Sequence, residues 1–280
     1  MSQTDNTLSH KVERSIKLLR SIPTDSPVEI AYSGGKDSDV ILRLAQMAGI
    51  PFEPIYKSTS IDPPGTIAHV LSRGARIIRP RKTFFQLVEE HGFPSRFIRF
   101  CCRILKEYKV NDRSIQGIRR EESVKRADRY REPEICRVYS KTEKATIYLP
   151  ILDWTLADET EFIKAEGIQC HRLYYDEWGC FHPERRVGCM CCPLAYYKHR
   201  LAEFQRYPGM VRCYIKAGQK WWDSHTNLRT KHHFSSVYEM FVATTFYHHL
   251  HEYFANKSAL FGTENYKSML ESYFKINLPG

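Results

Sequence analysis

Residues 31–40 read AYSGGKDSDV and place two glycines, a lysine, an aspartate and two serines close together. Paired glycines let a backbone approach an anion closely, and the first N–H groups of a following helix would point at that anion. The stretch therefore predicts a loop that holds phosphate. It does not match the Walker A pattern, which needs glycine at position 30 and serine or threonine after Lys36, where the chain has Ile30 and Asp37.

Four cysteines form a second group of residues that could do chemistry. Cys101 and Cys102 are adjacent, and Cys189 and Cys192 form a C-x-x-C pair much later in the chain. If the fold brings the pairs together, they supply four soft thiolates, which suit an iron–sulfur cluster or a zinc ion. Inert buried thiols are the remaining alternative.

Two further cysteines leave this ligand set open. Cys180 could replace Cys101 as the fourth ligand, or it could be a small buried apolar residue. Cys180 or Cys191 could instead carry a persulfide if a positive environment lowers its pKa, and Arg185 and Arg186 offer one nearby. We expect the other cysteines to be structural: Cys136, Cys170 and Cys213.

The segment GIRREES, which begins at Gly117, is a third candidate. The backbone of Gly117 can approach a nucleotide closely, Arg119 can meet a phosphate or a sulfate-like group with its bidentate fork, and Glu122 could orient that arginine. A surface charge ladder is the alternative. In SIDPPG, Asp62 could contact ribose or a metal ion, or it could start a turn before the two prolines.

Alternating strands and helices are expected to position these residues. The hydrophobic patterns predict an amphipathic helix at 7–22 and then a series of βα units: strands at 28–33, 53–57 and 75–79, helices at 38–48, 65–73 and 83–91, two further strands at 114–118 and 146–151, and a helix at 157–166. This order predicts an α/β fold with a doubly wound parallel sheet. Ligands bind such sheets at the carboxyl ends of the strands, where residues 33–38 fall.

The pattern changes after Pro193, where helical periodicity continues without strands. We therefore predict a domain at 1–193 and a helical C-terminal extension at 194–280. Within the extension, residues 206–222 mix basic and aromatic side chains, which suits a nucleic-acid surface or, alternatively, the core of a helix.

Composition limits the classes of protein. The formal net charge of +10 favours a polyanionic partner, although a solvated basic surface would also account for it. Nine cysteines without a signal segment, clustered as pairs, indicate a reducing cytoplasm rather than a secreted disulfide framework. No apolar stretch approaches 18 residues, so we expect no membrane span.

Residues 33–38, SGGKDS, resemble the SGGxDS loop of the N-type ATP pyrophosphatases, which cleave ATP between the α and β phosphates and adenylate a substrate. Within that group, CCRILK, GIRREES, PILDW and GCMCCP occur in the expected order over roughly residues 28–200, so the chain resembles the phosphoadenosine-phosphosulfate (PAPS) reductase family. The resemblance implies the fold of the adenine nucleotide alpha hydrolases.

The resemblance also implies the site and its cofactors. ATP and Mg²⁺ would bind, with Lys36, Asp37 and Arg119 as catalytic residues. A [4Fe–4S] cluster would bind Cys101, Cys102, Cys189 and Cys192, as in adenylyl-sulfate reductases, with zinc as the alternative. The nucleotide would contact Ser33, Gly34, Gly35, Lys36, Asp37, Ser38, Asp62, Gly117, Arg119 and Glu122.

Three functions compete. A sulfonucleotide reductase would need a cysteine near the C-terminus, whereas residues 214–280 contain none and lack the Glu-Cys-Gly segment of that family. The chain is closer in character to ATP pyrophosphatases that support DNA phosphorothioation or tRNA thiolation, which implies DNA or tRNA and a cysteine desulfurase as partners. A non-catalytic nucleotide-binding scaffold is the third possibility, against which Lys36, Asp37 and GIRREES argue. The sequence does not identify the acceptor or the sulfur donor.

Overall fold

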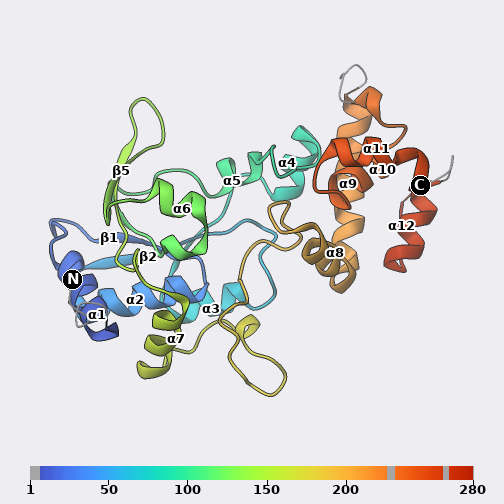
Figure 1. The fold of residues 1–280 in the computed structure, drawn as a ribbon. Helices are drawn as coiled ribbons and strands as arrows, with labels where there is room; N and C mark the ends of the chain where they lie inside the picture. Colours follow the sequence, from blue (N-terminus) through green and yellow to red (C-terminus); the bar gives the residue numbers. More distant parts are fainter. Residues whose placement is uncertain (1–6, 226–230, 261–264, 280) are drawn as a thin grey trace. The chain divides into compact units, whose positions relative to one another are not determined.

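The computed structural model describes residues 7–225, 231–260 and 265–279, which form two compact units (Figure 1). The first, here the sheet unit, comprises the described residues up to Ser58 with Asp62–Arg79 and Glu107–Gly188. The second, here the helical unit, comprises Thr59–Ile61, Pro80–Lys106 and the described residues from Cys189 onward. The helical unit therefore includes segments that precede the predicted extension at 194–280.

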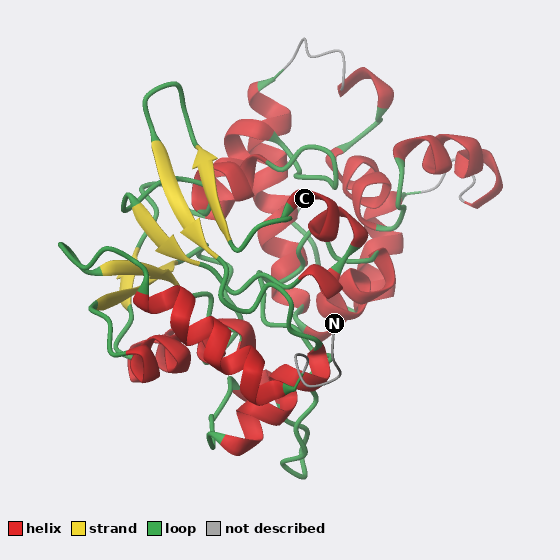
Figure 2. Ribbon diagram, turned by 60° about the vertical axis from the view of Figure 1, so that its left-hand side comes forward, coloured by secondary structure: helices red, strands yellow, loops and turns green. Residues whose placement is uncertain are grey.

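The sheet unit is built on one six-stranded sheet, shown in yellow in Figure 2. Its strands are β1 (Val28–Ala31), β2 (Phe52–Lys57), β3 (Arg76–Ile78), β4 (Arg113–Ile115), β5 (Glu134–Val138) and β6 (Lys144–Tyr148), in the order β3-β2-β1-β4-β6-β5. All neighbours are parallel except β5, which pairs antiparallel with β6. The mostly parallel α/β sheet with flanking helices confirms the predicted fold class.

The strand order reverses between β1 and β4. From β1 the chain moves outward to β2 and β3, and it then returns to place β4 on the other side of β1, with Ile30 opposite Ile115. In open α/β sheets the loops diverge at such a point and leave a crevice at the carboxyl ends of the strands. Residues 32–35 leave β1 there, and residues 116–119 leave β4 at the same edge.

Helices cover the sheet and fix the loops. They are α1 (Leu8–Arg20), α2 (Lys36–Ala48), α3 (Thr66–Ser72), α6 (Val124–Arg129) and α7 (Leu156–Ala165), with 3-10 turns at Arg120–Glu122 and Arg172–Tyr174. The apolar positions of α2, Val40, Ile41 and Leu44, are fully buried beside Ile30 of β1. α2 also contacts α1 and α7, so one packed layer holds the start of α2 in place.

The sequence did not predict β5 or α6. β5 alternates exposed and half-buried residues at the edge of the sheet, so its hydrophobic signal is weak. The six residues of α6 are too few to show helical periodicity, and none of them is buried.

The helical unit contains α4 (Phe84–His91), α5 (Phe100–Leu105), α8 (Tyr197–Arg206), α9 (Pro208–Ser224), α10 (Val237–Thr245), α11 (Leu250–Leu260) and α12 (Tyr266–Phe274), with a 3-10 turn at Lys231–His233. Its core is aromatic: the rings of Phe93 and Phe241, and of Phe204 and Tyr214, lie in edge-to-face contact at 5.5 and 5.2 Å. A Cβ on Gly218 of α9 would lie 2.3 Å from Phe93, so only glycine fits there.

This core corrects one interpretation of residues 206–222. Tyr214 and Trp221 are buried in the helical unit and cannot stack on bases, because they form the inner face of α9. Two of the exposed basic residues of that helix, Arg212 and Lys216, lie on the opposite face. For Tyr214 and Trp221 the helix core is therefore the correct alternative, whereas Tyr207 and Trp222 are half-buried.

Within the described ranges, no helix combines the length and the apolar character needed to cross a membrane.

Candidate functional site

The predicted phosphate loop joins β1 to α2. Gly34 has a φ of +76° in the left-handed region, and a Cβ there would also lie 3.2 Å from Val70. Gly35 is the N-cap of α2, so the first N–H groups of that 13-residue helix point out of the loop. The Ser38 side chain stabilises the turn, because its hydroxyl donates a hydrogen bond to the carbonyl of Gly35 at 2.6 Å. Ser33 donates to the Ser38 hydroxyl at 3.3 Å.

Gly117 lies against this loop. A Cβ on Gly117 would be 2.8 Å from the carbonyl oxygen of Asp37, closer than a side chain can approach. From the sequence, this glycine is predicted to let the backbone approach a nucleotide. In the structure its missing side chain admits the backbone of α2, and that contact brings the segment after β4 against the phosphate loop.

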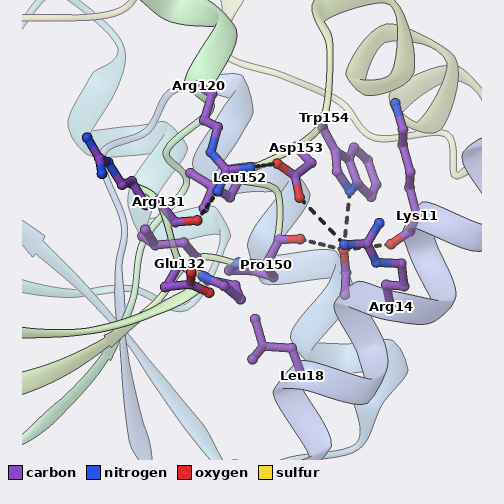
Figure 3. Close-up of a pocket in the computed structure, with 13 residues that line it drawn as sticks. Lys11, Arg14, Leu18, Arg120, Arg131, Glu132, Pro150, Leu152, Asp153 and Trp154 are labelled. Atoms are coloured by element: carbon purple, nitrogen blue, oxygen red, sulfur yellow. Dashed lines mark hydrogen bonds and ion pairs between the residues drawn. The ribbon is translucent and has the colours of Figure 1, made fainter. Parts of the chain in front are cut away.

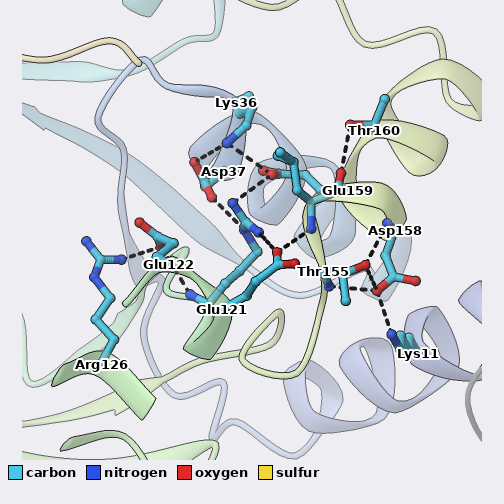
Figure 4. Close-up of polar contacts among 12 residues, drawn as sticks. Lys11, Lys36, Asp37, Glu121, Glu122, Arg126, Thr155, Asp158, Glu159 and Thr160 are labelled. Atoms are coloured by element: carbon cyan, nitrogen blue, oxygen red, sulfur yellow. Dashed lines mark hydrogen bonds and ion pairs between the residues drawn. The ribbon is translucent and has the colours of Figure 1, made fainter. Parts of the chain in front are cut away.

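Four charged side chains meet at this junction, and Figure 4 labels three of them, Lys36, Asp37 and Glu159. The Lys36 Nζ lies 3.1 Å from both Asp37 Oδ2 and Glu159 Oε2. The Arg119 Nε donates to Asp37 Oδ1 at 3.0 Å, and its second terminal nitrogen lies 3.4 Å from Glu159 Oε2. The predicted catalytic residues Lys36, Asp37 and Arg119 are therefore brought together, and a glutamate that the sequence analysis missed joins them.

Burial shapes the ionisation of this cluster. Burial raises the pKa of Glu159 to about 7, helped by the charge of Asp37 and opposed by Lys36 and Arg119. Burial also acts against the charge of Asp37, but Lys36 and Arg119 outweigh it and lower the pKa of that carboxyl. Burial works against the charge of Arg119 as well, yet Glu159 and Asp37 raise the pKa of its guanidinium.

Glu122 does not orient the Arg119 guanidinium as predicted. Its Oε1 accepts from the backbone N–H of Arg119 at 3.3 Å, and its carboxylate pairs with Arg126 and Arg186. The neighbouring Glu121 pairs with the guanidinium instead, at 2.9 Å, and also accepts from the backbone of α7. The segment that begins at Gly117 therefore makes ion pairs and hydrogen bonds within the site and is not a solvated charge ladder.

Asp62 follows β2, and its Oδ2 accepts from the Ser58 hydroxyl at 2.7 Å. This contact stabilises the turn that leads into the two prolines. Contact with ribose or a metal ion stays a prediction.

A second buried network lies behind the loop, and the sequence analysis did not identify it. Asp39, which is 2% exposed, accepts from the Tyr32 hydroxyl, and its carboxylate lies 3.3 Å from His69 Nε2 and 3.5 Å from Arg73 Nε. The His69 ring contacts that of His171 edge to face at 5.4 Å. The signal in the sequence was an aspartate at an inward position of α2, where an apolar residue would be ordinary.

The four predicted cysteine ligands all belong to the helical unit, two on α5 and two after Gly188. A hydrogen bond with Cys102 and burial raise the pKa of Cys101, and the charge of Cys192 adds to the effect. Burial raises the pKa of Cys192, followed by the charges of Cys189 and Cys102. Cys101, Cys102 and Cys189 also pack in or against one hydrophobic cluster of the helical unit, so the two pairs lie in the same region although they are remote in sequence.

These thiols match the donor set of a metal or an iron–sulfur cluster. Among the described residues, three donors lie within 4.8 Å of one another only at His248, His249 and Glu252, so no three of the four sulfurs are that close. Tetrahedral zinc, with bonds of about 2.3 Å, would hold its sulfurs closer than this. At the histidine set, Glu252 already accepts from the backbone N–H groups of His248 and His249 and caps α11.

The structure bears on one alternative for Cys180 and one for Cys191. Cys180 is exposed, so it is not a small buried apolar residue, and it belongs to the sheet unit. Its backbone N–H donates to Asp176 in a tight turn. Cys191 is buried, and burial with the charge of Glu203 raises the pKa of its thiol, which argues against a reactive persulfide carrier.

A cavity of about 300 Å³ lies beside α1 in the sheet unit (Figure 3). Its wall includes Arg120, the residue after Arg119, yet this guanidinium is occupied by Asp153 and by the carbonyls of Tyr130 and Arg131. The indole of Trp154 donates to Ser15 at 3.2 Å. These polar groups are satisfied within the protein, so the cavity does not require a ligand.

Comparisons with known proteins agree with the order of the motifs. Residues 27–195 match the family model described as the phosphoadenosine phosphosulfate reductase domain. An uncharacterized protein of Methanocaldococcus jannaschii is 31% identical over 185 residues, which is 60% of this chain and 36% of that protein. An uncharacterized protein of Escherichia phage 186 is 34% identical over 157 residues, which is 50% of this chain and 44% of that protein. The chain thus spans less than half the length of these curated relatives.

Solved structures show only distant similarity. The phosphoadenylyl-sulfate (PAPS) reductase of Candida auris, in a phosphate complex, aligns with a TM-score of 0.43 and 16% identity, covering 68% of this chain and 96% of that chain. The FMN adenylyltransferase of Candida glabrata aligns with a TM-score of 0.40 and 16% identity, covering 62% of each chain. At these scores the alignments do not bear on the chemistry of the site.

Proposed function

Because the chain belongs to the phosphoadenosine phosphosulfate reductase domain family, we propose that it is an ATP pyrophosphatase that adenylates an acceptor and thereby supports sulfur insertion into nucleic acid. At the level of the family it is a nucleotide-using enzyme. The proposal adds the reaction, the acceptor and the cofactors.

One observation carries the proposed reaction: two cations, Lys36 and Arg119, converge at the start of α2, at the point where the strand order reverses. The helix N-terminus and the two cations can hold the phosphates of ATP and stabilise the charge that develops on them. Gly34 and Gly35 leave room for the phosphates to approach the backbone.

In the proposed reaction an acceptor oxygen attacks the α phosphorus of ATP. The bond between that phosphorus and the oxygen bridging to the β phosphate breaks, and pyrophosphate leaves with the electron pair. Lys36 and Arg119 would stabilise the charge of the leaving group, and Mg²⁺, when bound with ATP, would supply further neutralisation. The acceptor is now adenylated, so a sulfur nucleophile can displace AMP and take the place of the oxygen. A cysteine desulfurase is the class of partner that would supply this sulfur.

The helical unit would hold the second cofactor. Cys101, Cys102, Cys189 and Cys192 fit a [4Fe–4S] cluster by number, donor type and membership of one unit. When bound, the cluster would supply a site for sulfur or electron transfer.

DNA or tRNA is a suitable acceptor because the chain has a formal net charge of +10, which attracts a polyanion. A mononucleotide needs only a few cations, and the sheet unit already places Lys36 and Arg119 for it. The remaining positive excess supports a polyanionic acceptor.

Product analysis tests the reaction. The protein should convert ATP to AMP and pyrophosphate, slowly alone and faster with the correct nucleic acid, and Lys36→Ala should abolish this activity. Lys82→Ala, which removes an exposed lysine paired with Glu90, is the matched control and should keep it. ADP and phosphate as the products would contradict the proposal. Sulfite release from adenylyl sulfate or PAPS with a thiol reductant would identify a sulfonucleotide reductase instead.

A further inference from the structure

Glu159 is a completely buried carboxylate inside a charged site. It lies in the first turn of α7, which begins after the N-cap Thr155 and packs against α2. Helix packing therefore fixes its backbone, and the side chain enters the cluster beside Lys36 (Figure 4). The sequence contained a sign of this: Glu159 lies on the same helical face as the apolar Phe162 and Ile163, where a charge is unusual.

Two cations and three carboxylates meet in the cluster. Asp37 and Glu159 each pair with both Lys36 and Arg119. The more exposed Glu121 pairs with Arg119 as well. The side chains of Lys36 and Arg119 are almost fully buried, with 6% and 5% of their surface exposed. Little water can therefore reach the two cations and take the place of the carboxylates. The carboxylates are therefore what keeps the two cations in place without a ligand.

The carboxylate of Glu159 is incompletely satisfied. Within the described part of the chain both of its oxygens are buried without a hydrogen-bond partner, and only Oε2 lies near cations, at 3.1 Å from Lys36 and 3.4 Å from Arg119. An ionised carboxylate with an unsatisfied buried oxygen is costly, whereas a protonated one loses much of that cost. The site therefore already holds Glu159 close to its neutral form.

The other titratable groups around Glu159 do not offset its charge. Asp37 on α2 is anionic and opposes the ionisation of Glu159. Cys170 and Tyr174, in the segment after α7, also interact electrostatically with Glu159, and burial raises the pKa of both well above neutral. They are uncharged at pH 7, so only Lys36 and Arg119 stabilise the anion.

We propose that Glu159 is a positioning residue that holds Lys36 and Arg119 in the empty site, yields both cations to an incoming polyphosphate, and takes up a proton as it does so. The inference rests on the proposed function in one respect, namely that Lys36 and Arg119 are the cations that bind phosphate.

The exchange follows from electrostatics. A polyphosphate at the start of α2 draws Lys36 and Arg119 toward its oxygens and adds negative charge beside Glu159. A buried carboxylate that loses its cationic partners and gains an anionic neighbour favours its neutral form. Binding is therefore linked to proton uptake, and it weakens as the pH rises above the value at which Glu159 ionises in the empty site. That value is about 7.

Titration calorimetry with inorganic pyrophosphate tests this linkage. Measurements without Mg²⁺, in two buffers of different ionisation enthalpy, give the number of protons taken up at pH 6 and at pH 8. Near pH 8 Glu159→Gln should bind pyrophosphate about tenfold more tightly than the wild type and take up nearly one proton fewer, because the amide needs no proton. At pH 6 the two proteins should agree within about twofold. Glu166→Gln, which changes a glutamate at the end of the same helix paired with Arg43, should behave as the wild type at both pH values.

A second measurement does not depend on the variant. Infrared difference spectra of the wild type at pH 8 should gain the carbonyl stretch of a protonated carboxylic acid when pyrophosphate binds. Equal proton uptake by wild type and Glu159→Gln, weaker binding by the variant at both pH values, absence of that band, or failure of pyrophosphate to bind would each overturn the proposal. Proton uptake without AMP formation from ATP would leave the inference standing and remove the proposed function. AMP formation without Glu159-dependent uptake would do the reverse.

Discussion

At the scale of single residues, the site depends on a close contact between the backbones of Gly117 and Asp37, which leaves no room for a side chain at Gly117. Gly117 lies after β4, and Asp37 lies in the first turn of α2, so their contact joins two segments that are distant in sequence. Arg119, two residues after Gly117, then reaches the carboxylate of Asp37. The position of the arginine therefore depends on how closely the glycine can approach.

Gly117→Ala should reduce ATP affinity and AMP formation together, by at least tenfold. The added methyl group would lie 2.8 Å from the Asp37 carbonyl, and a conflict of this kind in a packed region costs about 1–3 kcal/mol. Nucleotide binding and thermal unfolding measure the two effects. Gly209→Ala is the control, because a Cβ there meets no atom within 4 Å. Unchanged affinity in Gly117→Ala would show that the contact does not position Arg119.

Cysteine variants should separate the candidate cluster ligands. Protein purified without oxygen should be brown and contain iron and sulfide, and Cys102→Ser and Cys189→Ser should each lose the colour, because each removes a thiolate of the four-ligand set. Cys213→Ser, on the exposed side of α9, should keep it. Colourless protein with one equivalent of zinc would favour the structural-metal alternative. Loss of iron in Cys180→Ser but not in Cys101→Ser would assign the fourth ligand to Cys180.

At the scale of elements, one buried carboxylate joins two helices of the helical unit. Glu239 of α10 accepts from the backbone N–H and the hydroxyl of Ser235, each at 2.6 Å. From α11 it receives the Tyr253 hydroxyl at 2.6 Å and the Lys257 ammonium at 2.5 Å. Burial alone would raise its pKa, but Lys257, Ser235 and Tyr253 lower it to about 2. The anion therefore links α10 to α11.

Glu239→Gln should destabilise the protein by about 2 kcal/mol at pH 7, the scale of hydrogen bonds to a charged group. The pKa of Glu239 is lower in the folded protein than its usual value of 4.5, so its stabilisation is present above pH 4.5 and is lost as the pH falls toward 2. Urea unfolding across this range should show the difference between wild type and variant shrinking with acidity. The exposed Glu161→Gln should have little effect at any pH. A difference that does not depend on pH would argue against an ionised Glu239.

At the scale of the whole molecule, charge is the feature that bears on function. The chain has 42 lysines and arginines against 32 aspartates and glutamates. The exposed Arg212 and Lys216 lie one helical turn apart on α9, opposite its buried aromatic face. If the acceptor is nucleic acid, contact with its phosphates comes from charges such as these and not from the buried aromatic rings.

Binding to tRNA or duplex DNA should therefore weaken steeply with salt. Each neutralised phosphate of duplex DNA contributes a slope of about −0.9 to log K against log salt. Lys216→Gln should lower the slope by about one if that lysine contacts a phosphate. Lys82→Gln, at an exposed lysine paired with Glu90, is the control. Fluorescence anisotropy at several salt concentrations measures the slopes. Absent or salt-insensitive binding would remove nucleic acid as the acceptor.

The sequence by itself was sufficient to predict the glycine-containing loop between β1 and α2, most of the β and α elements and the fold class. These features depend on local order: the glycines and the lysine of SGGKDS are contiguous, and the apolar periods of β1 and α2 lie beside them. The four cysteines could be proposed as ligands because their types and spacing are local to each pair. That both pairs belong to one unit was decided by tertiary structure.

Tertiary structure alone decided which charges face one another. Glu159 is 123 positions from Lys36 along the chain, and it reaches the lysine only because α7 packs on α2. Glu121 rather than Glu122 contacts the Arg119 guanidinium, since the 3-10 turn at Arg120–Glu122 sets which carboxylate faces the arginine. Tyr214 and Trp221 of α9 pack inward for a similar reason: their burial depends on the neighbouring helices, which the periodicity of the sequence does not specify.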